Sequence, residues 1–135
     1  MTSISPPPFS QEQALRSAQR TFQAEINALA DLQAQLGQNF YQALQQILNC
    51  KGRLVITGIG KSGHIARKIA ATFASTGTPA FFMHAAEALH GDLGMITPQD
   101  VIIAISYSGA AAELLTILSA TKRLGCPFIA ITGHH

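Results

Sequence analysis

Apolar residues return every three or four positions through the first part of the chain, from Ser10 to about Gly37. This spacing predicts a long amphipathic helix, and Ser10 followed by Gln13 has the form of a capping box at its start. The apolar positions are Leu15, Ala18, Phe22, Ile26, Leu29, Leu32 and Leu36. We expect this stripe either to pack only on its own domain or to pack on a second subunit as well. A second, shorter helix should follow, with four residues inward: Phe40, Leu44, Ile47 and Leu48.

After residue 50 the pattern changes to short apolar runs, rich in β-branched residues and bounded by glycine or proline. Such runs predict buried strands, here over residues 54–57, 80–83, 101–105 and 127–131. After the first run, apolar residues recur at helical spacing as far as Gly77, and after the third run they do so as far as Gly125, so each of these segments predicts a helix. Residues 84–90 predict a short helical turn. Strands that alternate with helices predict a parallel sheet with right-handed crossovers. The expected fold class is therefore α/β, a three-layer α/β/α sandwich of the flavodoxin or Rossmann type.

Composition narrows the class of protein. The chain has 135 residues, of which 47% are hydrophobic and 12% charged, as expected for one compact domain with much buried surface. We expect that domain to span 10–135, after a disordered lead-in over 1–9 that contains three prolines. The net charge of +2 and the lack of a basic run argue against nucleic acid as a partner.

Membrane insertion and export are not expected either, because no stretch is long and apolar enough to span a bilayer and the N-terminus lacks an apolar signal region. Cys50 and Cys126 lie far apart without metal-ligand spacing. A cytoplasmic protein with reduced thiols is the simplest interpretation.

The turn after the first predicted strand is rich in glycine and carries a lysine. Gly58-Ile59-Gly60-Lys61-Ser62-Gly63 fits the G-x-G-x-x-G pattern of dinucleotide-binding folds. That fold also needs an acid after its second strand to hold the ribose, and the nearest acid here is Glu87. A Walker A loop fails as well, since Val55 stands where its first glycine is required. The N-terminus of a helix after such a turn nevertheless favours an anion.

A second turn, Ser106-Tyr107-Ser108-Gly109, follows the third strand and is expected to open the next helix. One such turn would usually be an ordinary helix cap, because serine is favoured there. Two turns at one edge of a sheet, one with the hydroxyls of Ser106 and Ser108 and the other with the charge of Lys61, favour a site for a single phosphate group.

Five segments together resemble the sugar isomerase (SIS) domains that bind phosphosugars, and within them the bacterial D-arabinose-5-phosphate isomerases. The segments are Gly58-Ile-Gly-Lys-Ser-Gly-His64, Ala70-Ala-Thr-Phe-Ala-Ser-Thr-Gly-Thr-Pro79, His90-Gly-Asp-Leu-Gly-Met95, Thr97-Pro-Gln-Asp100 and Ile105-Ser-Tyr-Ser-Gly109. The resemblance covers about residues 40–133. It implies interconversion of D-arabinose 5-phosphate and D-ribulose 5-phosphate through an enediol, at the start of Kdo synthesis for lipopolysaccharide. It also implies no cofactor, and a homo-oligomer, a tetramer built as a dimer of dimers.

The resemblance also assigns roles to single residues. Glu113 matches a position thought to act in catalysis, where it would serve as general base, and Lys61 matches an active-site lysine that would steady an oxyanion or the phosphate. The substrate-binding set that carries over is Gly60, Ser62, His90, Ser106, Tyr107, Ser108 and Gly109. His90 would lie near the sugar and could bind an inhibitory metal. Without the resemblance, Glu113 would be read as a solvated first-turn acid and His90 as a structural histidine.

Other residues are assigned more limited roles. Glu87 and Asp92 are candidates for the sugar hydroxyls, although loop acids are usually solvated, and His64 is read as an ordinary helix residue near the site. No role is assigned to His134 or His135.

The chain departs from the family pattern in two places. The family loop usually continues Ser-Gly-Glu-Ser/Thr, whereas Ala110, Ala111 and Ala112 follow Gly109 here. Ala111 lacks the hydroxyl that often gives a further bond to the phosphate, which should weaken binding by about 0.5–3 kcal/mol. Family members also continue beyond the fourth strand, with a further catalytic acid and histidine, so we expect this chain to be a C-terminally truncated SIS domain without CBS modules. Two alternatives therefore stay open, a phosphosugar-binding module without turnover and, less favoured, a nucleotide-binding Rossmann domain.

Overall fold

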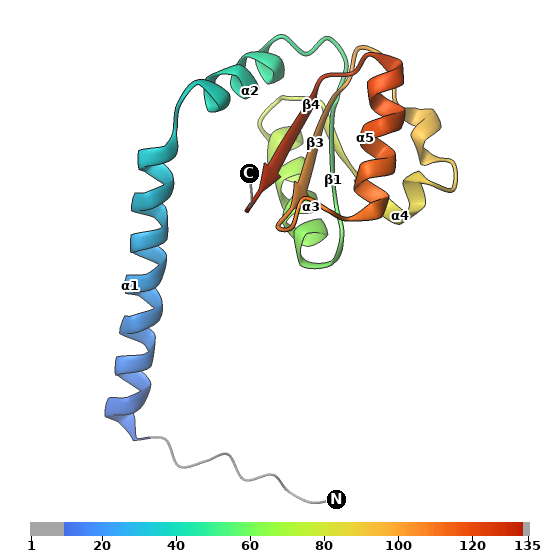
Figure 1. Cartoon of the computed structure of the whole chain (residues 1–135). Helices are drawn as coiled ribbons and strands as arrows, with labels where there is room; N and C mark the ends of the chain where they lie inside the picture. The colour runs from blue at the N-terminus through green and yellow to red at the C-terminus, as the bar shows by residue number, and fades with distance from the viewer. Residues whose placement is uncertain (1–9, 134–135) are drawn as a thin grey trace, which may run out of the picture. The chain divides into compact units, whose positions relative to one another are not determined.

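The computed structural model describes residues 10–133 (Figure 1), so the predictions for 1–9 and for His134 and His135 lie outside it. The elements are α1 (Gln11–Gln35), α2 (Gln38–Leu48), β1 (Leu54–Gly58), α3 (Gly60–Ser75), β2 (Ala80–His84), α4 (Ala85–Ala88), the 3₁₀ turn η1 (Asp92–Met95), β3 (Val101–Ser106), α5 (Ala112–Leu124) and β4 (Phe128–Thr132). Contacts divide the chain into two units, with the boundary between Phe40 and Tyr41.

The first unit consists mainly of α1, whose start confirms the predicted capping box. The Ser10 hydroxyl accepts the Gln13 N–H at 3.2 Å, and the Gln13 side chain accepts the Ser10 N–H at 3.1 Å. None of the helix's residues is buried, and the large apolar residues of the predicted stripe are 53–67% exposed. Most stability of a helix in a protein comes from packing of its apolar face, so this stripe is the surface through which α1 would be stabilised.

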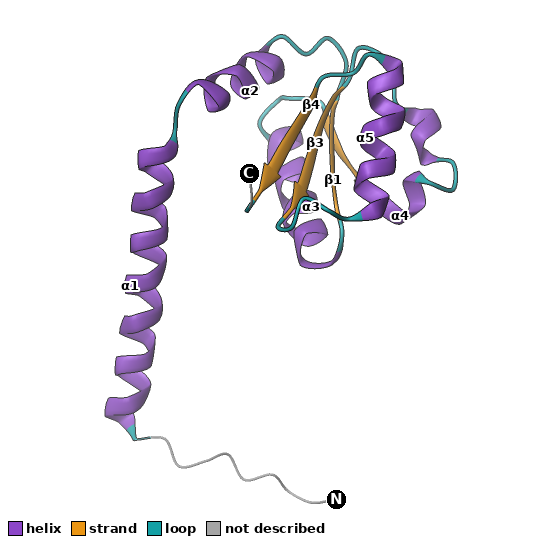
Figure 2. Ribbon diagram, viewed as in Figure 1, coloured by secondary structure: helices purple, strands orange, loops and turns teal. Residues whose placement is uncertain are grey.

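The second unit contains a four-stranded sheet in the order β2-β1-β3-β4, with every neighbouring pair parallel (Figure 2). The prediction of a parallel sheet is confirmed. Gly58, the last residue of β1, lies opposite His84 of β2 and Ile105 of β3, so three strands end at nearly the same level. The carboxyl ends of these strands therefore form one common edge.

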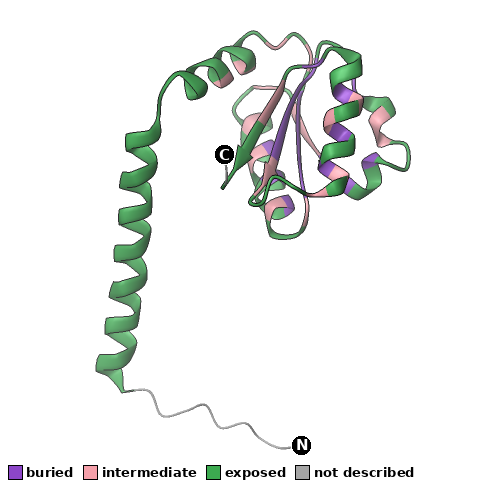
Figure 3. Cartoon of the chain, in the orientation of Figure 1, coloured by how far each residue is buried: buried purple, intermediate pink, exposed green. Residues whose placement is uncertain are grey.

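Helices cover both faces of this sheet, which confirms the three-layer sandwich (Figure 2). One core cluster joins alternate strand residues such as Val55 and Ile102 to α4 and to Leu114 and Ile117 of α5. The other joins Leu54 and Ile56, with their neighbours on β3, to Ala66 and Ala70 of α3. β1 and most of β3 are consequently buried on both sides (Figure 3), as near-continuous apolar strands predict.

The inward positions expected for α2 are only partly confirmed. Ile47 packs against the core cluster that includes α3, but Leu48 is 74% exposed and Leu44 is 38% exposed. A hydrophobic stripe on one helix marks the side that can be buried, and the described residues of this unit cover only part of it.

A buried carboxylate ties together the segments at the amino ends of the strands. Asp100, 1% exposed, accepts the Arg53 N–H at 2.7 Å, the Thr97 N–H at 2.8 Å and the Thr97 hydroxyl at 3.1 Å, and the Arg53 guanidinium lies 3.7 Å away. Gly52 passes so close that a Cβ there would overlap the carboxylate. Cys126, whose thiol pKa is raised by burial and by the Asp100 charge, donates from Sγ to the Thr97 carbonyl at 3.2 Å.

The pKa of Asp100 results from opposing effects. Burial raises it, but the Thr97 and Arg53 N–H groups, the Thr97 hydroxyl and the Arg53 guanidinium lower it, so the pKa lies below its ordinary value. A carboxylate with a lowered pKa in the folded state stabilises the fold above its unfolded pKa, and this contribution is lost as the pH falls through the folded pKa.

We predict that Asp100→Ala lowers the free energy of unfolding by about 2–4 kcal/mol at pH 7, because the Arg53 and Thr97 N–H groups lose their charged acceptor. Asp100→Asn, which keeps one acceptor oxygen, should cost less. Urea unfolding at pH 7 and at pH 3 measures the free energy of unfolding of both variants. The difference in this free energy between each variant and the wild type should be smaller at pH 3. An equal difference in the free energy of unfolding at both pH values would contradict the role of the ionised carboxylate.

Candidate functional site

Two turns meet at the carboxyl edge of the sheet, one after β1 and one after β3. The strands are hydrogen-bonded neighbours, and Gly58 at the end of β1 lies opposite Ile105, one residue before the end of β3. The strand order reverses here, because the chain moves outward from β1 to β2 on one side and from β3 to β4 on the other. In open α/β sheets, ligands bind at such a switch point.

The turn after β1 depends on glycine at two points of close approach. A Cβ at Gly58 would lie 3.0 Å from the Ser62 carbonyl, and one at Gly63 would lie 2.9 Å from the Gly58 carbonyl oxygen. Gly60 has φ +56, in the left-handed region. α3 begins at this residue, and Gly63 N–H is the first to bond back, to the Ile59 carbonyl at 3.2 Å.

The tight turn leaves three backbone donors at the start of α3, the N–H groups of Gly60, Lys61 and Ser62, which lie ahead of the helix's own hydrogen bonds. Ile59, the N-cap residue, provides no side-chain cap. Lys61 is exposed in this first turn and Ser62 is half-buried. Donors, helix dipole and ammonium group all favour an anion at this point.

The turn after β3 differs from the prediction, because Ser106–Gly109 does not itself open the helix. α5 begins at Ala112. The Ser106 hydroxyl accepts the Gly109 N–H at 3.1 Å, and the Ser108 hydroxyl accepts the Ala110 N–H at 3.3 Å. Serine side chains that bond to nearby backbone in this way compete with helix formation, which accounts for the later start.

The start of α5 lacks a side-chain cap. Its N-cap residue is Ala111, and Leu115 N–H is the first to bond back, to the Ala111 carbonyl at 3.1 Å. Serine or threonine at an N-cap would occupy one of the unpaired N–H groups, and alanine leaves the helix less stable by about 1 kcal/mol. Backbone donors of residues 112–114 are therefore left at the same edge of the sheet as those of α3.

Tyr107 and Gly109 complete this second turn. Gly133 N–H donates to the Tyr107 carbonyl at 3.0 Å and lies so close to the tyrosine ring that a Cβ there would overlap it. Gly109 has φ +66, in the left-handed region. The turn is thus held from the end of β4 as well as by its own serines.

Lys61 and Glu113 flank the switch point from opposite layers. Lys61 is in the first turn of α3 and Glu113 in the first turn of α5, and these helices cover opposite faces of the sheet. Glu113 is half-buried in that first turn. No ion pair between the two is found within residues 10–133.

The segment after β2 carries His90, Glu87 and Asp92. Glu87 is in the four-residue α4, and the His90 N–H donates to its carbonyl at 2.9 Å. Gly91, with φ +134, redirects the chain into η1, where Asp92 is the first residue. His90 is exposed, and the part of the chain that the structure describes has no group of three His, Cys, Asp or Glu residues suited to a metal ion. Metal binding at His90 stays a prediction.

Sequence reasoning missed two residues near this edge. His84 ends β2 opposite Gly58, and its Nδ1 accepts the Ala86 N–H at 3.2 Å as the cap of α4. Thr57, the residue before Gly58, is fully buried, and its hydroxyl has no hydrogen-bond partner within the described residues. A histidine between a strand and an alanine-rich turn was the available signal for the first. Nothing in the sequence marks the second.

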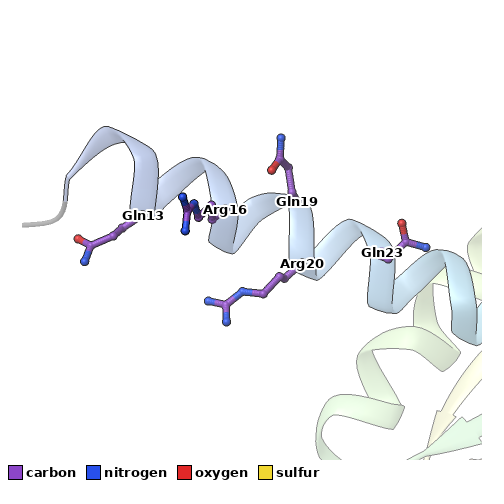
Figure 4. A pocket seen from close by; sticks show the side chains of 5 residues that line it. All are labelled: Gln13, Arg16, Gln19, Arg20 and Gln23. Atoms are coloured by element: carbon purple, nitrogen blue, oxygen red, sulfur yellow. The ribbon is translucent and has the colours of Figure 1, made fainter.

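Hollows in the surface do not change this assignment. The larger one follows α1 alone, and its side chains spread apart from a single helix that cannot enclose a ligand (Figure 4). Its lining residues are Gln13, Arg16, Gln19, Arg20 and Gln23. A smaller, mostly apolar hollow of about 70 Å³ lies between α5 and β4, and its lining includes Ser106, Gly109 and Thr132. Across residues 10–133, no helix combines the length and apolar character needed to span a bilayer.

Comparison with known proteins places these features in a family. The SIS domain model matches residues 47–135. The arabinose 5-phosphate isomerase KdsD of Pseudomonas aeruginosa is 53% identical over 120 residues, which cover 89% of this chain and 37% of that protein. KdsD of Escherichia coli K12 is 57% identical over 109 residues, which cover 81% of this chain and 33% of the relative. The chain thus spans about a third of the length of these curated relatives.

Solved structures agree. A protein of E. coli CFT073 in complex with arabinose 5-phosphate is 41% identical, with a TM-score of 0.87, and the match covers 94% of this chain and 68% of that one. Phosphoheptose isomerase GmhA of Neisseria gonorrhoeae, 20% identical with a TM-score of 0.67, shares the fold, with 88% of this chain and 74% of that chain covered. From the family match and these relatives, the chain belongs to the SIS domain family.

Proposed function

We propose that this chain is part of an isomerase that interconverts D-arabinose 5-phosphate and D-ribulose 5-phosphate. The observation that carries the proposal is the pair of donor-rich turns on neighbouring strands, in a chain whose curated relatives are named arabinose 5-phosphate isomerases. We further propose that the reaction occurs in the cytoplasm, at the start of Kdo synthesis for lipopolysaccharide.

The phosphate would bind between the two turns. N–H groups at the starts of α3 and α5 and the hydroxyls of Ser62, Ser106 and Ser108 can donate hydrogen bonds to its oxygens, and Lys61 supplies a positive charge. The two serine hydroxyls that accept backbone N–H groups still carry a proton to donate. Gly60, Gly109 and the Tyr107 backbone would shape this cradle.

The isomerisation requires a base beside C2 of the aldose. The base removes the C2 proton while the C1 carbonyl oxygen gains a proton, which gives the enediol. The O2 hydroxyl then loses its proton as C1 gains one, which gives the 2-ketose. Glu113 is our candidate for the base, since it lies in the first turn of α5, at the edge of the sheet where the phosphate would bind. Lys61 would stabilise the oxyanion that develops on the enediol, and His90 would lie beside the sugar hydroxyls.

A second candidate is a phosphosugar-binding module without turnover. One observation favours it, the three alanines that follow Gly109. Both candidates share the phosphate site and differ only in the chemistry beyond it.

We also propose that the chain forms a homo-oligomer in which α1 pairs with α1 of a second copy. Leu15, Phe22, Leu29 and Leu36 recur every seven residues, the spacing of a helix-to-helix seam, and each is more than half exposed. The first half of the helix has a net positive charge, because Glu12 and Arg16 pair with each other and Arg20 follows. The second half carries the anions Glu25 and Asp31. This distribution favours an antiparallel pair, in which opposite charges come together.

We predict that Lys61→Ala weakens binding of arabinose 5-phosphate at least tenfold, because the dianion loses a charged hydrogen-bond donor. Lys68→Ala is the matched control on the same helix, since the Lys68 ammonium donates to the Thr72 hydroxyl of its own helix at 3.1 Å. Isothermal titration calorimetry measures both dissociation constants. Equal affinity of Lys61→Ala and wild type would remove Lys61 from the site.

Turnover separates the two candidate functions. Conversion of arabinose 5-phosphate by the 135-residue chain, followed as ribulose 5-phosphate, supports the isomerase. In that case Glu113→Gln should lower kcat about 10²–10⁴-fold with little change in binding, as expected on loss of a general base. Binding without turnover would favour the module, and a Glu113→Gln variant of unchanged kcat would eliminate Glu113 as the base.

We predict that Leu29→Glu dissociates the oligomer, since it places a charge in the apolar seam. Because an α-helix has 3.6 residues per turn, Asn27→Glu adds the same charge on nearly the opposite side of the helix. This variant should leave the mass of the oligomer unchanged. Size-exclusion chromatography with light scattering measures the mass of each. A monomeric wild type would instead indicate that the stripe packs within its own chain.

A further inference from the structure

His84 lies where β2 reaches the carboxyl edge of the sheet, and its side chain turns back onto the backbone. The residue has an extended conformation, with φ −70 and ψ 129, and is the N-cap of α4. Nδ1 of the imidazole accepts the Ala86 N–H at 3.2 Å. This bond connects the last residue of a sheet strand to the first turn of the segment that follows it.

The imidazole is oriented by a second contact on the same strand. The rings of Phe82 and His84 meet edge to face, with centroids 6.2 Å apart and planes at 84°. The Arg67 guanidinium of α3 in turn lies 4.4 Å from the centre of the Phe82 ring. Aromatic and cation–π contacts of this kind favour one arrangement of the rings, so α3 and β2 together hold the capping imidazole in place.

The hydrogen bond that Nδ1 accepts also determines the tautomer of the neutral imidazole ring. Nδ1 must present its lone pair, so a neutral His84 carries its proton on Nε2. Serine, aspartate or asparagine would cap a helix equally well. Histidine differs from these because one ring can accept the Ala86 N–H and still pack against Phe82.

The His84 cap sets the position of residues 85–90. His84 lies opposite Gly58, the first residue of the glycine turn, and so shares its level at the sheet edge. Glu87 and His90 follow within six residues, and the His90 N–H bonds to the Glu87 carbonyl at 2.9 Å. The direction in which the chain leaves β2 therefore determines where these two residues stand relative to the turn after β1.

We propose that His84 is a positioning residue, whose Nδ1 cap holds the segment with Glu87 and His90 in a fixed place beside the phosphate turn. The role assigned to Glu87 and His90 rests on the proposed function. The cap itself does not, because it is a contact between described residues. His84 acts through Ala86 and touches no reacting atom in this proposal.

Two variants of the full chain separate the cap from the imidazole as such. His84→Ala removes the acceptor, whereas His84→Asn keeps an acceptor oxygen at a residue type favoured as an N-cap. The first readout is hydrogen exchange of the Ala86 amide by NMR, with the amide shifts of Glu87 and His90 recorded alongside. The second is the dissociation constant for arabinose 5-phosphate. His64→Ala, an exposed histidine on α3, serves as the control for exchange at Ala86.

We expect His84→Ala to exchange the Ala86 amide about fivefold faster or more, the change that loss of a typical cap implies. The Glu87 and His90 amide shifts should move and arabinose 5-phosphate should bind less tightly, while His84→Asn restores all three. His64→Ala should leave Ala86 exchange as in wild type.

Unchanged Ala86 exchange in His84→Ala would overturn the cap. Restored exchange in His84→Asn without restored affinity would overturn the positioning role, because the imidazole would then act on the ligand directly. If the wild type fails to bind arabinose 5-phosphate, the proposed function fails, and the exchange rates and amide shifts alone still decide whether His84 positions the segment.

Discussion

Parallel pairing of β1 with β3 is the constraint on which the rest of this structure depends. These two strands are adjacent in the sheet although α3, β2 and α4 lie between them in the sequence. Their pairing brings the turn after Gly58 and the turn after Ser106 to the same edge, and it directs α3 and α5 to opposite faces. Neither turn alone would distinguish an anion site from an ordinary helix start; together they surround one position from two layers.

Much of the fold could be predicted from local patterns. The capping box at Ser10, the apolar runs that became four strands, and the stop at Gly125 all depend on residues close together in the sequence. Gly125 has φ +77, which explains why glycine ends α5 there. Because all the strands are parallel, both turns follow carboxyl ends and lie at one edge, which is where ligands bind in such sheets.

The parts that could not be predicted depend on contacts between distant residues or on competition within a turn. Asp100 binds the backbone of Arg53, 47 residues away, and no spacing in the sequence indicates that partner. α5 begins later than the serine turn predicts, because the hydroxyls of Ser106 and Ser108 take up backbone N–H groups that a helix start would leave free. For His84, the deciding contact is between its own side chain and a backbone group two residues on, which residue type alone does not reveal.

The Asp100 network is at the amino ends of the strands, and both donor-rich turns are at the carboxyl ends. The buried carboxylate and the candidate chemistry are thus separated by the length of β1 and β3. Residues in the turns can therefore vary with little effect on the Asp100 network, which is the condition under which one scaffold can acquire new specificities. The alanines at 110–112 would be such a tolerated variation. The same separation makes the carboxyl ends of the strands a practical place to engineer recognition of other phosphorylated ligands.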